Sequence, residues 1–219
     1  MIDRRHLLFG ASAAGFASAL PIATHARADG ARARRVLRIL RDGSDIGMHS
    51  LTATHGPDRF EMRIEIDIRV RLLGITAYRY THENTEVWEG GALAALMTRT
   101  NDDGDEYYAN LKRAGDVLEI DGSGYSGTAP LNAAPTSYYA RPFIDRRPWI
   151  STQSGKPLEI DIATAGASQT FDVTGELTTT LGYNAAGEWV ECRFDAGGEP
   201  GAYEVVENDG AITPLWQGA

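Results

Sequence analysis

The sequence predicts an all-β protein: a single antiparallel meander of about ten strands that forms a barrel or a strongly curved half-barrel. Three observations predict this fold. One twelve-residue segment alternates apolar and charged residues without an error, short apolar segments recur between turns rich in Gly, Asp and Asn, and no stretch after residue 28 shows strong helical periodicity with caps. The sequence has no internal repeat and no domain linker, so we expect residues 29–219 to form one β domain.

The alternating segment, residues 60–71, is the clearest element. Its even positions are Phe, Met, Ile, Ile, Ile and Val, and each odd position is Glu, Asp or Arg. Because alternate side chains of a strand point to opposite faces, one face is apolar and the other meets water, as in an antiparallel sheet. Twelve residues span about 40 Å, roughly twice the usual strand length. Such a long apolar face needs a cover, which favours a barrel or curved half-barrel.

The remaining strands lie between turn signals such as Asp42-Gly43 and Asp103-Gly104. The segment 76–88 alternates more weakly than the others. The expected strands are 36–41, 48–55, 60–71, 76–88, 93–99, 106–113, 117–121, 158–163, 170–183, 188–195 and 203–207.

Residues 122–154 interrupt this pattern. The segment contains four prolines, which exclude central strands, and five aromatic residues, which argue against disorder. We expect an irregular crossover that folds across the sheet and covers part of its apolar face, with a short helical turn around Ser137 to Ala140. The alternative is a packed surface crossover without a ligand role.

The first 28 residues are typical of a twin-arginine export signal. Arg4 and Arg5 precede an apolar stretch from Leu7 to Ala23, and Ala26 and Ala28 provide the small residues that signal peptidase accepts. The alternative, an uncleaved membrane span, requires roughly 20 apolar residues, and this stretch is shorter and broken by Gly and Pro. Cleavage after Ala28 would leave 191 residues with 18 basic and 29 acidic side chains, a net charge of −11. We therefore expect a periplasmic location without a stable transmembrane span after cleavage.

Composition narrows the function classes. The 219 residues are 42% hydrophobic and 23% charged, values typical of a globular protein. A net charge of −9 disfavours nucleic-acid binding, because phosphate backbones repel an acidic protein. A single cysteine excludes an internal disulfide framework and any multi-cysteine metal site.

The chemical motifs are weak, and we predict no catalytic residues, no metal site and no cofactor. Residues 122–127 match G-x-G-x-x-G, but the sequence that follows contains Pro130 and Pro135 and cannot open the helix that a dinucleotide site needs. The acidic run 101–106 lacks the spacing of a calcium loop and is better explained as a hairpin turn.

Three histidines and one cysteine remain after the expected cleavage site. His49 shares a predicted strand face with Leu51, and His82 alternates with Tyr80 and Asn84. None of the histidines has the spacing typical of metal ligands, and ordinary hydrogen-bonded histidines are the expectation. Cys192 lies on the apolar face of a strand, where a lone cysteine is usually a core residue.

The best candidate site is a group of aromatic residues and arginines within the crossover. Aromatic rings and guanidinium groups together bind anionic or amphiphilic ligands by stacking and bidentate hydrogen bonds. Alternatively, the arginines pair with surface acids. The predicted ligand-binding residues are Tyr138, Tyr139, Arg141, Phe143, Arg147 and Trp149.

Three segments resemble a family of exported, functionally uncharacterised proteins of Gram-negative bacteria, known only as a domain of unknown function. They are residues 86–93, which include Trp88, Gly90 and Gly91, and residues 97–104 and 36–47. The resemblance spans Val36 to Glu207 and implies a periplasmic β-rich fold in which a curved sheet surrounds an apolar interior. It brings no catalytic residues. We interpret Trp88 as a structural anchor at a strand end and Gly90-Gly91 as the turn after it.

Three functions remain open. The first is a non-enzymatic periplasmic protein that binds a hydrophobic or amphiphilic small molecule inside the curved sheet. The second is a cell-envelope assembly or interaction protein that binds partner proteins through its sheet edges. The third is a hydrolase or isomerase, which would be favoured by a cavity where His49, His82 or acids of perturbed pKa converge.

Overall fold

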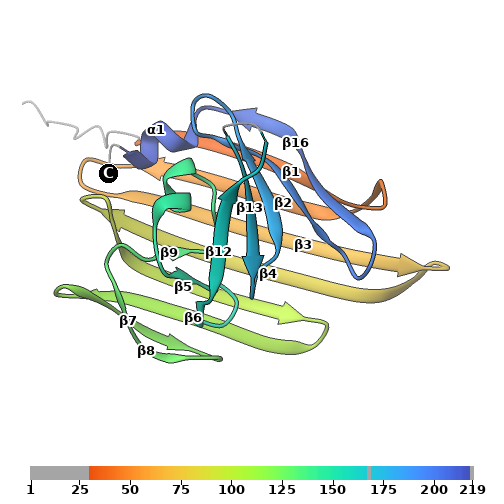
Figure 1. Cartoon of the computed structure of the whole chain (residues 1–219), viewed down its shortest axis with the longest axis horizontal. Helices are drawn as coiled ribbons and strands as arrows, with labels where there is room; N and C mark the ends of the chain where they lie inside the picture. Colours follow the sequence, from red (N-terminus) through yellow and green to blue (C-terminus); the bar gives the residue numbers. More distant parts are fainter. Residues whose placement is uncertain (1–29, 167–168, 218–219) are drawn as a thin grey trace, which may run out of the picture.

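A computed structural model describes residues 30–166 and 169–217, in which sixteen strands, one 3₁₀ helix and one α-helix form (Figure 1). The all-β prediction is confirmed, but the expected count of about ten strands is wrong. Two reasons are that the supposedly irregular crossover contains short strands and that residues 170–183 form two strands. The strands are β1 (Ala31–Arg41), β2 (Ser44–His55), β3 (Phe60–Leu72), β4 (Ile75–Glu89), β5 (Ala92–Asp102), β6 (Asp105–Ala114), β7 (Val117–Gly122), β8 (Ser126–Pro130), β9 (Ala134–Pro135), β10 (Trp149–Ile150), β11 (Pro157–Leu158), β12 (Ile160–Thr164), β13 (Thr170–Gly175), β14 (Thr179–Tyr183), β15 (Trp189–Asp195) and β16 (Pro200–Asp209).

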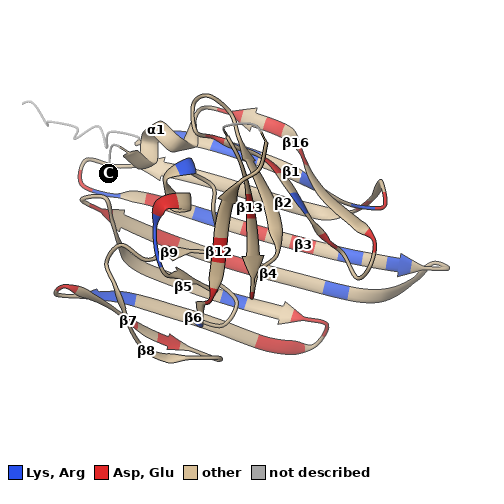
Figure 2. Ribbon diagram, viewed as in Figure 1, with Lys and Arg blue, Asp and Glu red and all other residues tan. Residues whose placement is uncertain are grey.

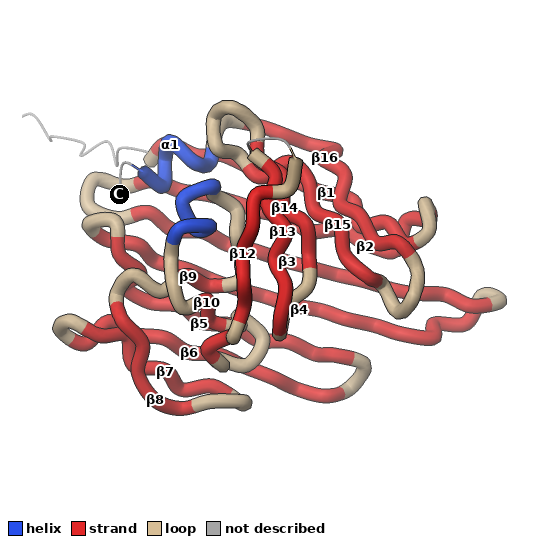
Figure 3. Tube along the Cα trace, viewed as in Figure 1, coloured by secondary structure: helices blue, strands red, loops and turns tan. Residues whose placement is uncertain are grey.

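Thirteen of these strands form one antiparallel sheet in the order β12-β13-β14-β15-β16-β1-β2-β3-β4-β5-β6-β7-β8. The chain therefore makes two meanders, and the last strand of the second pairs with the first strand of the first, so that Val36 lies opposite Glu207. A single meander is thus not what forms. Within the described residues the outer strands β8 and β12 do not pair with each other, so the sheet curves without closing into a barrel (Figure 3).

The long alternating segment is β3, paired along its length with β4. Phe60, Met62 and Ile64 are buried on the inner face, while Arg63 and Glu65 are exposed on the outer face. The burial predicted from the alternation weakens toward the end of the strand, where Ile66 and Ile68 are only half-buried.

A second layer covers the inner face of the sheet. It consists of the three-stranded sheet β11-β10-β9 and the 3₁₀ helix η1 (Arg141–Asp145). Phe143 packs against Trp88 with ring centroids 5.3 Å apart, and the Tyr139 hydroxyl donates a hydrogen bond of 3.0 Å to buried Glu86. The helical turn expected at Ser137 to Ala140 is wrong; it begins after Ala140, because Pro142 fits the first turn of a helix.

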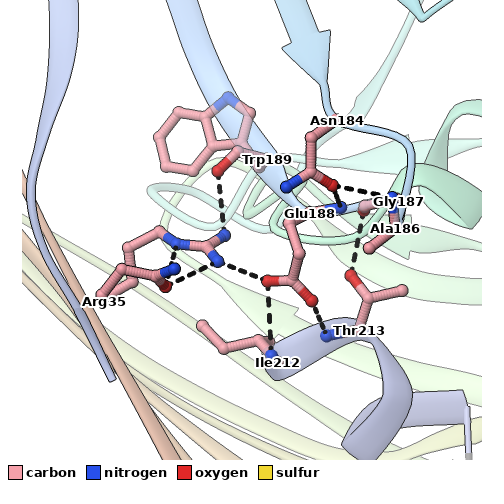
Figure 4. Close-up of polar contacts among 9 residues, drawn as sticks. Arg35, Asn184, Ala186, Gly187, Glu188, Trp189, Ile212 and Thr213 are labelled. Carbon is pink, nitrogen blue, oxygen red and sulfur yellow. Dashed lines mark hydrogen bonds and ion pairs between the residues drawn. The ribbon is translucent and has the colours of Figure 1, made fainter. Parts of the chain in front are cut away.

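The C-terminal helix α1 (Ile212–Gln217) is attached to the sheet by a buried polar cluster (Figure 4). The Arg35 guanidinium lies 2.6 Å from the Glu188 carboxylate, and their side chains are 1% and 4% exposed. Glu188 accepts the backbone N–H groups of Ile212 and Thr213 at 3.3 and 2.6 Å. The negative carboxylate of Glu188 lies at the start of α1 and accepts two of its N–H groups. This buried ion pair therefore connects β1, the residue that precedes β15, and α1.

Candidate functional site

A cavity of about 420 Å³ lies between the inner face of β2–β4 and the second layer. The sheet contributes apolar side chains, including Ile64, Ile66 and Ile68, together with polar ones. The loops that follow β9 and β10 in the second layer contribute polar groups from residues 136–138 and 151–153. The cavity lining therefore combines apolar and polar groups, and its volume is typical of small-molecule sites.

Strand alternation places an unusual series of polar side chains on the inner face. The even-numbered residues of β4 point inward, and they include Tyr80, His82, Asn84 and Glu86. The strand register then aligns His49 of β2 and His82 of β4 on either side of Ile66 in β3. Two imidazoles from strands that are not neighbours thus line one cavity.

The His49 side chain is buried in aromatic surroundings. Its ring lies 5.3 Å from the Trp189 ring and 5.5 Å from the Tyr203 ring, and both ring nitrogens lack a hydrogen-bond partner among the described residues. Burial, together with repulsion from His82, lowers the pKa of His49 to about 3. The ring is therefore neutral at physiological pH and has one donor and one acceptor nitrogen.

His82 and Asn84 are further polar side chains that the sheet contributes to the cavity. The Nδ1 atom of His82 lies 2.7 Å from the Thr100 hydroxyl, and burial lowers the pKa of His82 to about 4. Asn84 donates a hydrogen bond of 2.9 Å to Glu86, but its own carbonyl oxygen has no partner in the described chain. Each such buried unpartnered group costs about 1–3 kcal/mol.

Glu86 is the buried carboxyl next to this cavity. It accepts hydrogen bonds from the side chains of Asn84, Trp88 and Tyr139 at 2.9, 3.0 and 3.0 Å. Burial raises the pKa of Glu86 above its ordinary value, and these hydrogen bonds oppose the rise. All three donors bind the carboxyl from within the core, so Glu86 connects β4 to the second layer.

The structure distributes the six predicted ligand-binding residues unevenly. Tyr138 lines the cavity, while Tyr139, Phe143 and Trp149 are fully buried in the core. The two arginines contact other parts of the protein. Arg141 forms an ion pair of 2.6 Å with Asp145, and Arg147 donates hydrogen bonds to the carbonyl oxygens of Ile144 and Arg146. Their assignment as ligand-binding residues stays a prediction, and only Tyr138 lies at the cavity described above.

The structural residues of the sequence analysis lie at the end of β4. Trp88 is fully buried, where its ring meets that of Trp216 edge to face at 5.4 Å. Gly90 and Gly91 form the following turn with φ values of 58° and 73°, a conformation that glycine adopts at low cost.

The other motifs of the sequence analysis lie in turns and in the core of the structure. The glycine-rich segment 122–127 forms the turn between β7 and β8, in which Gly122 N–H donates to the Tyr125 carbonyl at 2.9 Å. The described residues contain no group of three or more His, Cys, Asp or Glu side chains positioned for a metal ion. Burial raises the pKa of Cys192 to about 12, so its thiol is protonated at neutral pH.

Sequence reasoning placed His49 and His82 on strand faces but did not select them as site residues. The available signal was the inward alternation of β4, in which polar residues take positions that β3 fills with isoleucine. Their meeting across Ile66 depends on the register of three strands, which the sequence alone did not give.

Comparisons with known proteins agree with this fold and assign no activity. The model of a domain of unknown function (DUF6134) matches residues 37–206. No curated protein matches the chain. The crystal structure of a β-barrel-like protein of domain of unknown function DUF1849 from Brucella abortus is similar with a TM-score of 0.50 and 10% identity, over 83% of this chain and 97% of that chain. This similarity concerns the fold alone. Neither helix among the described residues is long and apolar enough to cross a membrane.

Proposed function

The chain belongs to the family of the domain of unknown function DUF6134, and we propose that it is an exported, non-enzymatic protein that binds an amphiphilic small molecule in the cavity between its sheet and its second layer. The observation that carries this proposal is a cavity of about 420 Å³ whose lining combines apolar isoleucines with the side chains of His49 and Asn84, which carry buried polar atoms without a partner among the described residues. A ligand whose polar group reaches these two side chains would supply the missing hydrogen-bond partners, while its apolar part remains against the isoleucines.

The polar group of the ligand is uncharged in this proposal. Both imidazoles are neutral, because burial lowers the pKa of His49 to about 3 and that of His82 to about 4. Among the described lining residues Glu176 is the one carboxylate, it pairs with Lys156, and none is Lys or Arg. A buried charged headgroup would lack a partner here, whereas a hydroxyl or amide group can bind the neutral rings and the Asn84 carbonyl.

The apolar part of the ligand has room beyond the cavity. A second hollow, of about 460 Å³, is lined by Ile46, Val70 and Phe194 and shares Ile68 and Tyr78 with the cavity. The two spaces follow the inner face of β3, so an elongated apolar chain could extend from one to the other. This continuity favours an amphiphile over a compact polar metabolite.

Export rests on the twin-arginine leader, residues 1–28, which lies outside the described residues. The twin-arginine pathway exports proteins that have already folded, so a binding protein for amphiphiles would reach the periplasm with its cavity formed. Native mass spectrometry of protein recovered from the periplasm tests both points: the mass of a 191-residue chain would support cleavage after Ala28, and a retained small-molecule mass would identify the ligand class.

A filled-cavity variant tests the site directly. Ile66→Trp places a larger ring among the cavity-lining side chains, and we expect it to weaken binding of the neutral dye Nile red at least about tenfold. Met97→Trp, on a side chain 61% exposed, is the matched control and should bind the dye as the unaltered protein does. Equal dye binding by the Ile66 variant and the control would contradict the proposal.

Two other functions each have one supporting observation. The convergence of His49 and His82 favours a hydrolase or isomerase, but the low pKa values make both rings weak bases and poor acids at neutral pH. The outer strands β8 and β12 favour a partner-binding protein, because each pairs on one side only within the described sheet. If the protein hydrolyses an ester and His82→Gln abolishes this activity, the function would be that of a hydrolase and not of a binding protein.

A further inference from the structure

The β3–β4 hairpin extends beyond the rest of the sheet (Figure 1). Pairing of β2 with β3 ends where Gly47 meets Ile68, and pairing of β5 with β4 ends where Tyr80 meets Asp102. Residues 69–79 therefore pair in the sheet only with one another. Hydrogen bonds between Arg79 and Asp103 hold the base of this ribbon to the β5–β6 turn.

The tip of the ribbon, which we call the hairpin apex, consists of Leu72, Leu73, Gly74 and Ile75. Its three aliphatic side chains are 67%, 96% and 73% exposed, more than any other large hydrophobic residue in the described chain. Leu73 also has a φ of 52°, a left-handed conformation that costs roughly 1–2 kcal/mol for a residue other than glycine. Asn, Asp or Gly would suit this turn better, so folding alone does not explain Leu73.

The charge of the ribbon is opposite to that of the chain. The ribbon and the two residues before it, 67–79, contain three arginines and one aspartate, a net charge of +2 in a chain of net charge −9 (Figure 2). Asp67 lies 3.4 Å from Arg69 and 3.5 Å from Arg79, and Arg71 forms no ion pair with the described residues. The nearby carboxylates of Asp42, Asp45 and Glu199 line a hollow shared with Arg69 and Arg71 at the side of the ribbon.

We propose that the hairpin apex docks onto an anionic lipid bilayer. The aliphatic side chains of Leu72, Leu73 and Ile75 enter the boundary between headgroups and acyl chains, and the arginines behind them approach the lipid phosphates. A two-residue turn is too small for a stable protein interface, which buries about 1,200–2,000 Å². A bilayer needs only a few inserted side chains and nearby positive charge, which the apex provides.

Cosedimentation with lipid vesicles tests this proposal on protein recovered from the periplasm of an expression host. Binding is expected with mixed phosphatidylcholine–phosphatidylglycerol vesicles, and it should weaken with added salt and be weaker with phosphatidylcholine alone. The triple variant Leu72→Ser, Leu73→Asn, Ile75→Thr should lose at least about tenfold in affinity. Its fold should remain, because the three side chains are exposed and Asn accepts a positive φ.

Charge variants and controls complete the experiment. Arg69→Gln combined with Arg71→Gln should reduce binding to the anionic vesicles about tenfold or more, since each arginine near the surface contributes about fivefold. The double change Met97→Ser, Arg99→Gln on exposed positions of β5 is the matched control and should leave binding unchanged. The Ile66→Trp variant should also bind vesicles normally, which separates this proposal from that of the cavity.

Three results would overturn the proposal. The first is no binding of the unaltered protein to either vesicle type. The second is equal binding by the triple apex variant. The third is a loss of self-association in the apex variant, measured by sedimentation velocity without lipid, which would show that the apex contacts a second copy of the chain.

Discussion

The buried pair Arg35–Glu188 gives a quantitative prediction about stability. Glu188→Gln keeps the size of the side chain and removes the charge that faces the Arg35 guanidinium at 2.6 Å. Arg35 is then buried without a counter-ion, with only neutral partners such as Asn208 and the Trp189 carbonyl. Leaving one member of a buried ion pair uncompensated costs about 3–5 kcal/mol.

The expected loss is large enough to measure by thermal and urea unfolding followed by circular dichroism. For a chain of this size each kcal/mol shifts the unfolding midpoint by about 2–4 °C, so we expect a decrease of about 6–20 °C. Arg59→Met, which removes the exposed partner of Glu61, is the control and should change stability by less than about 1 kcal/mol.

A double variant examines the same reasoning from the other side. In Arg35→Met with Glu188→Gln the uncompensated charge is gone, and the carbonyl oxygen of the remaining Gln can still accept one of the two N–H groups of α1. The loss should therefore be clearly smaller than the sum of the two single losses. Additive losses, or a Glu188→Gln loss below about 1 kcal/mol, would refute the view that a desolvated ion pair holds α1 to the sheet.

Two further predictions concern single side chains. The folded pKa of His49, about 3, lies below its ordinary value of 6.5, so the unfolded chain takes up a proton first as the pH falls, and stability decreases from about pH 6.5 down to about pH 3. In urea unfolding over this pH range, the free energy of unfolding of His49→Phe should decrease by about 1.4 kcal/mol less per pH unit than that of the unaltered protein. The same pH dependence in both proteins would contradict the burial of a neutral ring at this position. Leu73→Asn should raise the free energy of unfolding by about 1 kcal/mol, because Asn tolerates a φ of 52°, and Leu72→Asn should not; equal effects would indicate that the turn is unstrained.

The sequence allowed the fold class to be predicted because alternation is a local property. The alternation within residues 60–71 is enough to predict one buried face, and Phe60, Met62 and Ile64 are buried on that face in the structure. The strand count and the pairing of β16 with β1 could not be predicted in the same way, because they depend on contacts between residues that are far apart in the chain. Short strands such as β9 and β10 have only two residues each and leave no periodic signal.

The cavity illustrates the same limit at the level of single residues. His82 and Asn84 lie at inward positions of a weakly alternating strand. Polar residues at such positions are equally typical of a strand face that is exposed to solvent. Only the second layer, which lies over the inner face, decides that they are buried. The aromatic residues of the crossover drew attention because of their type, and apart from Tyr138 those of the predicted site are buried in the core instead.

Both proposals concern the β3–β4 hairpin, which departs in two ways from the usual burial of apolar side chains and exposure of polar ones. On β4 polar groups occupy inward positions and remain partly unpaired; at the apex aliphatic groups occupy outward positions and one has a strained backbone. Each departure lowers stability, and neither compensates the other through a contact, because they lie in different parts of the β3–β4 hairpin. The apolar hollow lined by Ile68, Val70 and Tyr78 lies between them along the inner face. Taken together, the two proposals describe a protein that collects an amphiphile from a bilayer: the hairpin apex would contact the lipid, the hollow would receive the apolar part of the ligand, and the polar side chains of the cavity would bind its polar group.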